Sequence, residues 1–186
     1  MKKIYIMLTF TGTTLSRVIK IYTRNDYSHA SIALDPELSE MYSFGRKKPR
    51  NPFIGGFIKE KIDDGVYKRF YNTECIVYSM DVTFEQYEKV KEIIKEFEKE
   101  QDKYRYNFLG VLAVVFKMSL DRKYHYFCSQ FVSEVLERSG IFNFDREFTM
   151  IKPSDIQKLE NLNVVYRGLL RDYAYSNELM LNADFM

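Results

Sequence analysis

The chain has 186 residues, which is enough for one domain with a substantial buried core. Its contents of 46% hydrophobic and 29% charged residues are ordinary for a globular protein, and a net charge of +2 gives no strong electrostatic attraction to nucleic acid. Cys75 and Cys128 are too few for a disulfide framework, so we expect a reducing, cytoplasmic setting.

The first half of the chain predicts mostly strands. Residues 4–10 alternate in polarity and are interpreted as a strand, because the short apolar run has no small-residue cleavage site after it. Residues 13–22 have helical spacing, and "SHASIAL" (28–34) with "EMYSFGR" (40–46) predicts a hairpin. The prolines and glycines of 47–56 predict a loop. Further strand-like pieces lie at 56–62, 66–70 and 74–81.

The second half predicts mostly helices. Residues 83–101 open with the capping-box spacing of Thr83 and Gln86, and their apolar face includes Phe84 and Phe97. The other predicted elements are a helix over about 106–118, a helix from Cys128 to Gly140, a short helix in "KPSDIQKLE", a strand in "NVVYRGLL" and a frayed tail from about 173. Strands early and helices late indicate a single α+β domain over 1–186.

We expect no transmembrane segment, since the best apolar run, "FLGVLAVVF" at 108–116, is too short to span a bilayer. This run has two interpretations. It is a buried core helix, or it lines a pocket for an acyl chain.

Cys128 stands where an amphipathic helix begins, in "HYFCSQFVSEVLERSG". Most single cysteines are simply packed in a core, and Cys75, inside the alternating strand "ECIVYSM", fits that description. At the first turn of a helix, however, unpaired N–H groups and the helix dipole favour an anion. A cysteine there is a better nucleophile at neutral pH, and the same N–H groups can hold a substrate oxyanion.

A nucleophilic thiol needs a base, and the chain has two histidines. His125 precedes Cys128 by three residues, outside the helix, whereas His29 lies in the strand "YSHASIAL". We expect His29 to be the base, although a histidine on a strand is often only a half-buried structural residue.

The order of three motifs resembles a known superfamily. "YSHASIAL", the returning "MYSFG" and the late "YFCSQFVSEVL" are similar to the circularly permuted form of the NlpC/P60 superfamily, which includes the YaeF/YiiX-type amidase-like proteins and the lecithin:retinol acyltransferase-like proteins. "KYRYNFLG" (103–110) and "PSDI" (153–156) resemble the stretches that flank the cysteine helix in that group, so the likeness runs from about residue 4 to about 170. It implies an α+β, papain-like fold in permuted order, with an antiparallel sheet and the Cys128 helix packed across its edge.

The resemblance also implies a third polar residue, which orients the imidazole from the next strand. If the hairpin turn centres near Pro36, Ser43 lies across from His29. Glu40 is the competing candidate, and it can face the imidazole only if the strand register changes by one residue. The alternative interpretation of Ser43 is an ordinary serine on a strand, with no role at the site. The oxyanion donors would be the N–H of Cys128 and the hydroxyl of Tyr106.

These features predict a cysteine amidase or peptidase that attacks an amide or ester carbonyl through a thioacyl intermediate, without metal or organic cofactor. The substrate would be a small amide, a peptide or an acyl-lipid. An acyltransferase on the same fold would share the first step.

Two hypotheses from other classes remain. The H-x-x-C spacing of His125 and Cys128, with Cys75 and His29 as a second pair, suggests a metal site, but zinc motifs usually present two tight pairs. The other hypothesis is a binding module with a vestigial site, in which the basic loop "GRKKPRNPF" (45–53) meets phosphates or an anionic membrane surface. No nucleic-acid motif accompanies that loop.

Overall fold

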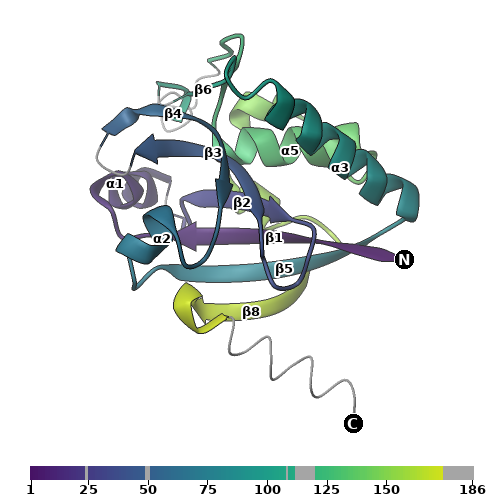
Figure 1. The fold of residues 1–186 in the computed structure, drawn as a ribbon, viewed down its shortest axis with the longest axis horizontal. Coiled ribbons are helices and arrows are strands. Elements are labelled where there is room, and N and C mark those ends of the chain that lie inside the picture. Colours follow the sequence, from purple (N-terminus) through teal and green to yellow (C-terminus); the bar gives the residue numbers. More distant parts are fainter. Residues whose placement is uncertain (24, 49–50, 108, 112–119, 174–186) are drawn as a thin grey trace.

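A six-stranded antiparallel sheet forms the centre of the protein (Figure 1). The computed structural model describes residues 1–23, 25–48, 51–107, 109–111 and 120–173. The strands of the sheet are β1 (Lys2–Phe10), β2 (His29–Ala33), β3 (Met41–Lys48), β4 (Asn51–Glu60), β5 (Glu74–Val82) and β8 (Asn163–Leu169), in the spatial order β4-β3-β2-β1-β5-β8. The prediction of an α+β protein is confirmed.

Helices pack on the sheet and lie near one of its ends. They are α1 (Thr14–Thr23), α2 (Gly65–Arg69), α3 (Phe84–Lys99), α5 (Cys128–Arg138) and α6 (Pro153–Ile156), with single 3₁₀ turns η1 (Phe148–Met150) and η2 (Leu170–Asp172). A separate parallel pair joins β6 (Arg105–Tyr106) to β7 (His125–Tyr126). In Figure 1, α3 and α5 lie side by side on one face of the sheet, while α1 and α2 lie near the end where β2 begins.

The sheet separates two hydrophobic cores, because side chains alternate between its faces. Ile4, Ile6 and Leu8 of β1 are fully buried on the face that α3 and α5 cover. Tyr5 and Met7 point the other way, into a smaller core. The sequence of β1 is therefore almost continuously apolar, as expected for a central strand that is buried on both faces.

Aromatic rings fix α3 and α5 to the sheet. The ring centroids of Phe97 on α3 and Phe131 on α5 are 5.0 Å apart, and both rings lie within 6 Å of Phe44 on β3. Edge-to-face pairs at these distances add stabilisation beyond the apolar area they bury. Phe131 and Val132 are fully buried on the face of β2 and β3. The expectation that the Cys128 helix packs across the sheet edge is therefore wrong, since only a broad face can bury its apolar stripe.

Several helix ends follow their local sequence signals. At the start of α3, the Thr83 hydroxyl accepts from the N–H of Gln86 at 3.1 Å, and the Gln86 side chain accepts from the N–H of Thr83 at 2.9 Å, as the predicted capping box requires. α5 ends at Arg138, and Gly140 two residues later has a φ of +70°, which suits the glycine that commonly follows a helix. α6 begins with Pro153.

Two local predictions were wrong. Part of the loop predicted over 47–56 is strand, because β4 begins at Asn51 as an edge strand, where a proline removes no needed hydrogen bond. The strand predicted at 66–70 is the helix α2, which Asp64 caps by accepting from the N–H of Gly65 at 2.6 Å.

Other predictions fall partly or wholly outside the described residues. Of the helix predicted over about 106–118, residues 106–107 and 109–111 are described: Tyr106 lies in the strand β6, so the predicted start is wrong, and 109–111 are helical. The apolar run at 108–116 lies mostly outside the described residues, and the tail beyond 173 lies wholly outside them.

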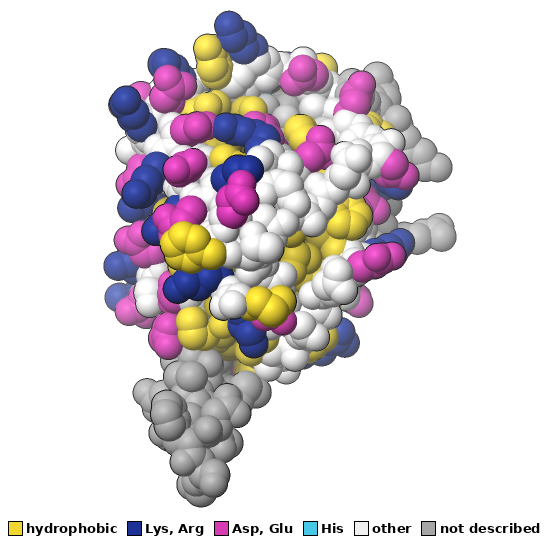
Figure 2. Space-filling view, turned by 90° about the vertical axis from the view of Figure 1, so that its right-hand side faces the viewer, with side chains coloured by type: hydrophobic (Ala, Val, Ile, Leu, Met, Phe, Trp, Pro, Cys, Tyr) yellow, Lys and Arg dark blue, Asp and Glu magenta, His cyan; other side chains and the backbone are white. Residues whose placement is uncertain are grey.

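Among the described residues, no helix combines the length and the apolar character needed to cross a membrane. The face shown in Figure 2 has interspersed acidic and basic side chains with small apolar areas between them. On that face, the described side chains therefore form no extended field of one sign.

The aromatic contacts generate a prediction about stability. Phe97→Ala should lower the free energy of unfolding by about 3–5 kcal/mol, because it opens a cavity where α3, α5 and the sheet meet. Phe84→Ala is the matched control in the same helix. Phe84 is 66% exposed, against the prediction that it belongs to the apolar face, so its loss should change stability by no more than about 0.5 kcal/mol. Urea denaturation of both variants measures the difference, and equal losses would contradict this view of the core.

Candidate active site

Cys128 is the first residue of α5 and is buried. The first hydrogen bond within the helix runs from the N–H of Phe131 to the carbonyl of Phe127 at 3.1 Å. The N–H groups of residues 128–130 therefore lie outside the helix's own hydrogen bonds, at the positive end of its dipole. The start of α5 offers Cys128 the environment that the sequence indicated.

His29 is the first residue of β2, and it hydrogen-bonds to both Cys128 and Glu60. Its Nε2 lies 3.0 Å from Oε1 and 3.1 Å from Oε2 of Glu60. Since Glu60 occupies Nε2, Nδ1 is the ring nitrogen left open to Cys128. The imidazole thus stands between a carboxylate and a thiol, an arrangement in which the carboxylate fixes the ring and its tautomer.

The surroundings of His29 favour its charged form. Burial by itself lowers the pKa of His29, but the carboxylate of Glu60 and the charge of Cys128 outweigh burial and hold this pKa well above its ordinary value. The direction of this shift favours the charged imidazole, which can stabilise a thiolate on Cys128.

Further hydrogen bonds fix Glu60. The hydroxyl of Ser31, two residues along β2 from His29, donates to Glu60 Oε2 at 2.5 Å. The hydroxyl of Tyr67 on α2 lies 3.5 Å from that of Thr9 and also hydrogen-bonds to Ser31. A largely buried carboxylate is tolerated when it is paired and hydrogen-bonded, and the half-buried Glu60 meets both conditions.

Glu60 was not found from the sequence, and Ser43 is not the partner of the imidazole. The hydroxyl of Ser43 donates to the backbone carbonyl of Ala30 at 2.7 Å. Tyr42 pairs with Ile32, so the same register places Gly45, not Ser43, beside His29. A Cβ atom on Gly45 would indeed lie 3.6 Å from Cε1 of His29. The hairpin turn is centred one residue later than expected, which moves its partners by two.

Glu40 is also away from the imidazole. It accepts a hydrogen bond from Tyr42 at 2.8 Å and pairs with Lys59 at 3.4 Å. The Nδ1–H of His125 donates to the backbone carbonyl of Lys123 at 2.9 Å. Neither residue therefore takes the role that Glu60 or His29 holds at the site.

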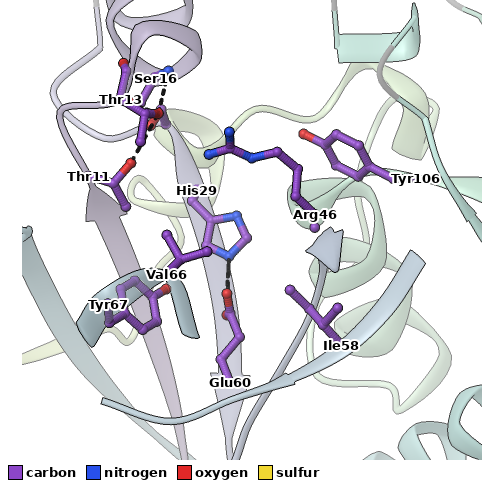
Figure 3. A pocket seen from close by; sticks show the side chains of 12 residues that line it. Thr11, Thr13, Ser16, His29, Arg46, Ile58, Glu60, Val66, Tyr67 and Tyr106 are labelled. Carbon is purple, nitrogen blue, oxygen red and sulfur yellow. Dashed lines mark hydrogen bonds and ion pairs between the residues drawn. The ribbon is translucent and has the colours of Figure 1, made fainter. Parts of the chain in front are cut away.

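Tyr106 faces the same cavity as His29 (Figure 3). Its strand packs closely on β4, where a Cβ atom on Gly55 would lie 2.6 Å from Cβ of Tyr106. Burial, and then the charge of Cys128, raise the pKa of Tyr106, so its hydroxyl stays protonated at neutral pH. A protonated phenol beside Cys128 can donate a hydrogen bond to a developing oxyanion.

The second cysteine is chemically inert in comparison. Burial raises the pKa of Cys75 to about 12, so its thiol stays protonated at neutral pH. Cys75 and His29 both pair with Thr9 of β1, from opposite sides, which separates them by two strand spacings or about 10 Å. They cannot share a metal ion. Among the described residues, no group of three or more His, Cys, Asp or Glu side chains is arranged to hold one.

No protein-family model matches this chain, and no curated protein matches its sequence significantly.

The raised pKa of His29 generates a prediction. Glu60→Gln should lower this pKa towards the ordinary value of about 6.5, as measured by NMR titration of the imidazole nitrogens. Because the folded-state pKa lies above the unfolded value, protonated His29 stabilises the fold fully below about pH 6.5, and that stabilisation is lost as the pH rises through the folded-state pKa. His29→Gln should remove this pH dependence from the free energy of unfolding. A wild-type pKa at or below 6.5 would contradict the assignment.

Proposed function

We propose that the protein is a cysteine hydrolase of the amidase or peptidase class, with Cys128 as nucleophile, His29 as acid and base, and Glu60 as the residue that orients His29. The observation that carries the proposal is the position of one imidazole between a carboxylate and a thiol at the start of a helix. The order of the motifs, which resembles the circularly permuted, papain-like NlpC/P60 group, adds support that is independent of this geometry.

The reaction follows from the charges at the site. The thiolate of Cys128 attacks the carbonyl carbon of an amide or ester, and the carbonyl electrons move to oxygen. The N–H groups at the start of α5 and the hydroxyl of Tyr106 stabilise that oxyanion. His29 then gives its proton to the leaving amine or alcohol, and a thioester remains on Cys128. Water, deprotonated by His29, attacks the thioester, the acid leaves, and the thiolate of Cys128 and the charged imidazole are restored.

An acyltransferase is the second candidate, because an amine or alcohol can replace water in the last step. The proposed substrate class is a small amide, a peptide or an acyl-lipid. Neither cysteine forms a disulfide bond, which agrees with the proposed cytoplasmic setting.

Alkylation with iodoacetamide tests the nucleophile and its base. The thiolate is the form that reacts, and we expect the charge of His29 to stabilise it. Without His29, Cys128 should behave as an ordinary thiol, which is only a few per cent ionised at pH 7, so His29→Ala should slow the alkylation of Cys128 by about tenfold or more. His125→Ala is the matched control and should leave the rate unchanged. Mass spectrometry locates the label, and Cys128→Ala reports any reaction at Cys75. If His125→Ala slowed the reaction and His29→Ala did not, the base would be misassigned.

Acylation by p-nitrophenyl acetate tests the oxyanion donor. Tyr106→Phe should reduce the acylation rate of Cys128 by roughly 10–1000-fold, because the hydroxyl stabilises charge that exists only after carbonyl attack. Alkylation by iodoacetamide forms no oxyanion, so its rate should stay within about twofold of wild type. Equal losses in both reactions would show that Tyr106 acts on the thiol, and no loss in either would remove it from the site.

Glu60→Gln should lower steady-state ester hydrolysis by on the order of 100-fold or more, since the neutral amide neither fixes the tautomer of His29 nor stabilises its charge. Ser43→Ala is the matched control on the neighbouring strand and should retain activity. Hydrolysis is followed by release of p-nitrophenolate, and EDTA in the assay distinguishes this mechanism from metal-dependent hydrolysis. Activity that depends on Ser43 and not on Glu60 would return the orienting role to Ser43.

A further inference from the structure

A second pocket, of about 500 Å³, lies beside α5, and the mechanism proposed above does not use it. Gln130, Glu134 and Glu137 follow one another at spacings of four and three residues, so they share one face of the helix and line the pocket together. The other described walls come from just before α5 and from the region of η1, and they are Asp121, Tyr126, Arg146, Glu147, Phe148 and Thr149.

The described walls of this pocket carry more negative than positive charge. Their charged residues are the carboxylates Asp121, Glu134, Glu137 and Glu147 and the guanidinium of Arg146. Arg146 is shared with two further carboxylates outside the lining, Asp145 at 3.5 Å and Asp155 at 4.0 Å. It therefore compensates at most a small part of the negative charge.

The contacts of the wall carboxylates leave most of this charge in place. Glu134 pairs with Arg138 at 3.3 Å, but the same guanidinium also pairs with Glu96. Glu137 accepts from the backbone N–H of Phe144 at 2.9 Å, and such a neutral donor holds a carboxylate without cancelling its charge. A cleft that is lined mainly by one sign of charge concentrates ligands of the opposite sign.

Gln130 provides the observation that points to a ligand. This wall residue is only 5% exposed. Within the described part of the chain, its Oε1 is the one buried side-chain oxygen or nitrogen that has no hydrogen-bond partner. A buried amide oxygen without a donor destabilises the folded state. A ligand in the pocket that donates a hydrogen bond to Oε1 would remove this cost.

The ligand should therefore combine positive charge with hydrogen-bond donors. Among the described residues, no group of three or more His, Cys, Asp or Glu side chains is arranged to hold a metal ion, so the carboxylates do not converge on one point. An ammonium has three N–H donors and a guanidinium has five, which can reach acceptors on separate walls. The rings of Tyr126 and Phe148 offer such a cation aromatic surface as well.

We propose that this pocket binds an organic cation, an alkylammonium or guanidinium group, with Oε1 of Gln130 as a hydrogen-bond acceptor and the wall carboxylates as the counter-charge. The inference does not depend on the proposed function, since the pocket shares no described lining residue with the cavity at His29. A free polyamine and the side chain of a lysine or arginine in a peptide both present this chemistry.

Titration with butylammonium chloride tests the pocket at constant ionic strength. The backbone amide signals of residues 146–149 should shift saturably in NMR spectra of the full chain. 1-Butanol has the same carbon chain without the charge, and it should bind at least about tenfold more weakly, because it lacks a charge-assisted hydrogen bond. Equal binding of the two compounds overturns the inference. Binding of Mg²⁺ at the same signals with higher affinity than butylammonium also overturns it.

Two variants connect the binding to the walls. Gln130→Met nearly keeps the length of the side chain and removes the acceptor, so butylammonium should bind about tenfold more weakly. Its Tm without ligand should be unchanged or higher, since the unpaired oxygen is gone. Asp121→Asn removes an exposed charge and should weaken the binding and reduce its dependence on salt. Gln101→Met, at an exposed glutamine outside the pocket, is the matched control and should bind as wild type does.

The outcomes decide the inference and then the source of the cation. Unchanged affinity in both Gln130→Met and Asp121→Asn overturns the site, and a lowered Tm in Gln130→Met shows that the amide is already paired within the fold, which also overturns it. Tighter binding of 1,4-diaminobutane than of butylammonium assigns the site to a polyamine. Tighter binding of a blocked Ala-Lys-Ala peptide assigns it to a basic peptide. If both bind more weakly than butylammonium, the inference fails.

Discussion

The packing of α5 on the face of β2 and β3 is the constraint on which the candidate site depends. Phe131 and Val132 hold this helix in the larger core, together with Phe44 from the sheet and Phe97 from α3. The start of α5, and Cys128 with it, is thereby held at the end of β2 where His29 stands. Because interiors are close-packed, a change in these rings moves the thiol relative to the imidazole.

The pairing of His29 with Glu60 illustrates why buried charge is tolerated at this site. Each group alone would be costly to remove from water, and burial alone would drive the imidazole towards neutrality. Together, with Ser31 donating to the carboxylate, they favour the charged form of the imidazole next to Cys128. The fold thus supplies one strong electrostatic interaction at the place where the proposed chemistry needs it.

Sequence reasoning worked where the signal was local or periodic. The capping box at Thr83, the glycine at 140 and the helix that begins at Cys128 each depend on a few neighbouring residues. It failed where partners are distant. Glu60 lies 31 residues from His29, and one residue of error in the centre of the hairpin turn was enough to place Ser43 beside the imidazole instead of Gly45.

The sequence by itself determined the α+β class and the start of α5, because alternation and helix starts depend on consecutive residues. The choice of His29 as the base for Cys128 came from the resemblance of the motif order to the permuted group. Only the tertiary structure decided that Glu60 contacts His29, and that Arg46 and Tyr106 face the same cavity. These contacts depend on the registers of β2, β3 and β4 and on how β6 packs across Gly55. Strand register is set by the turns and by the burial of whole faces, so no single segment of the chain carries it.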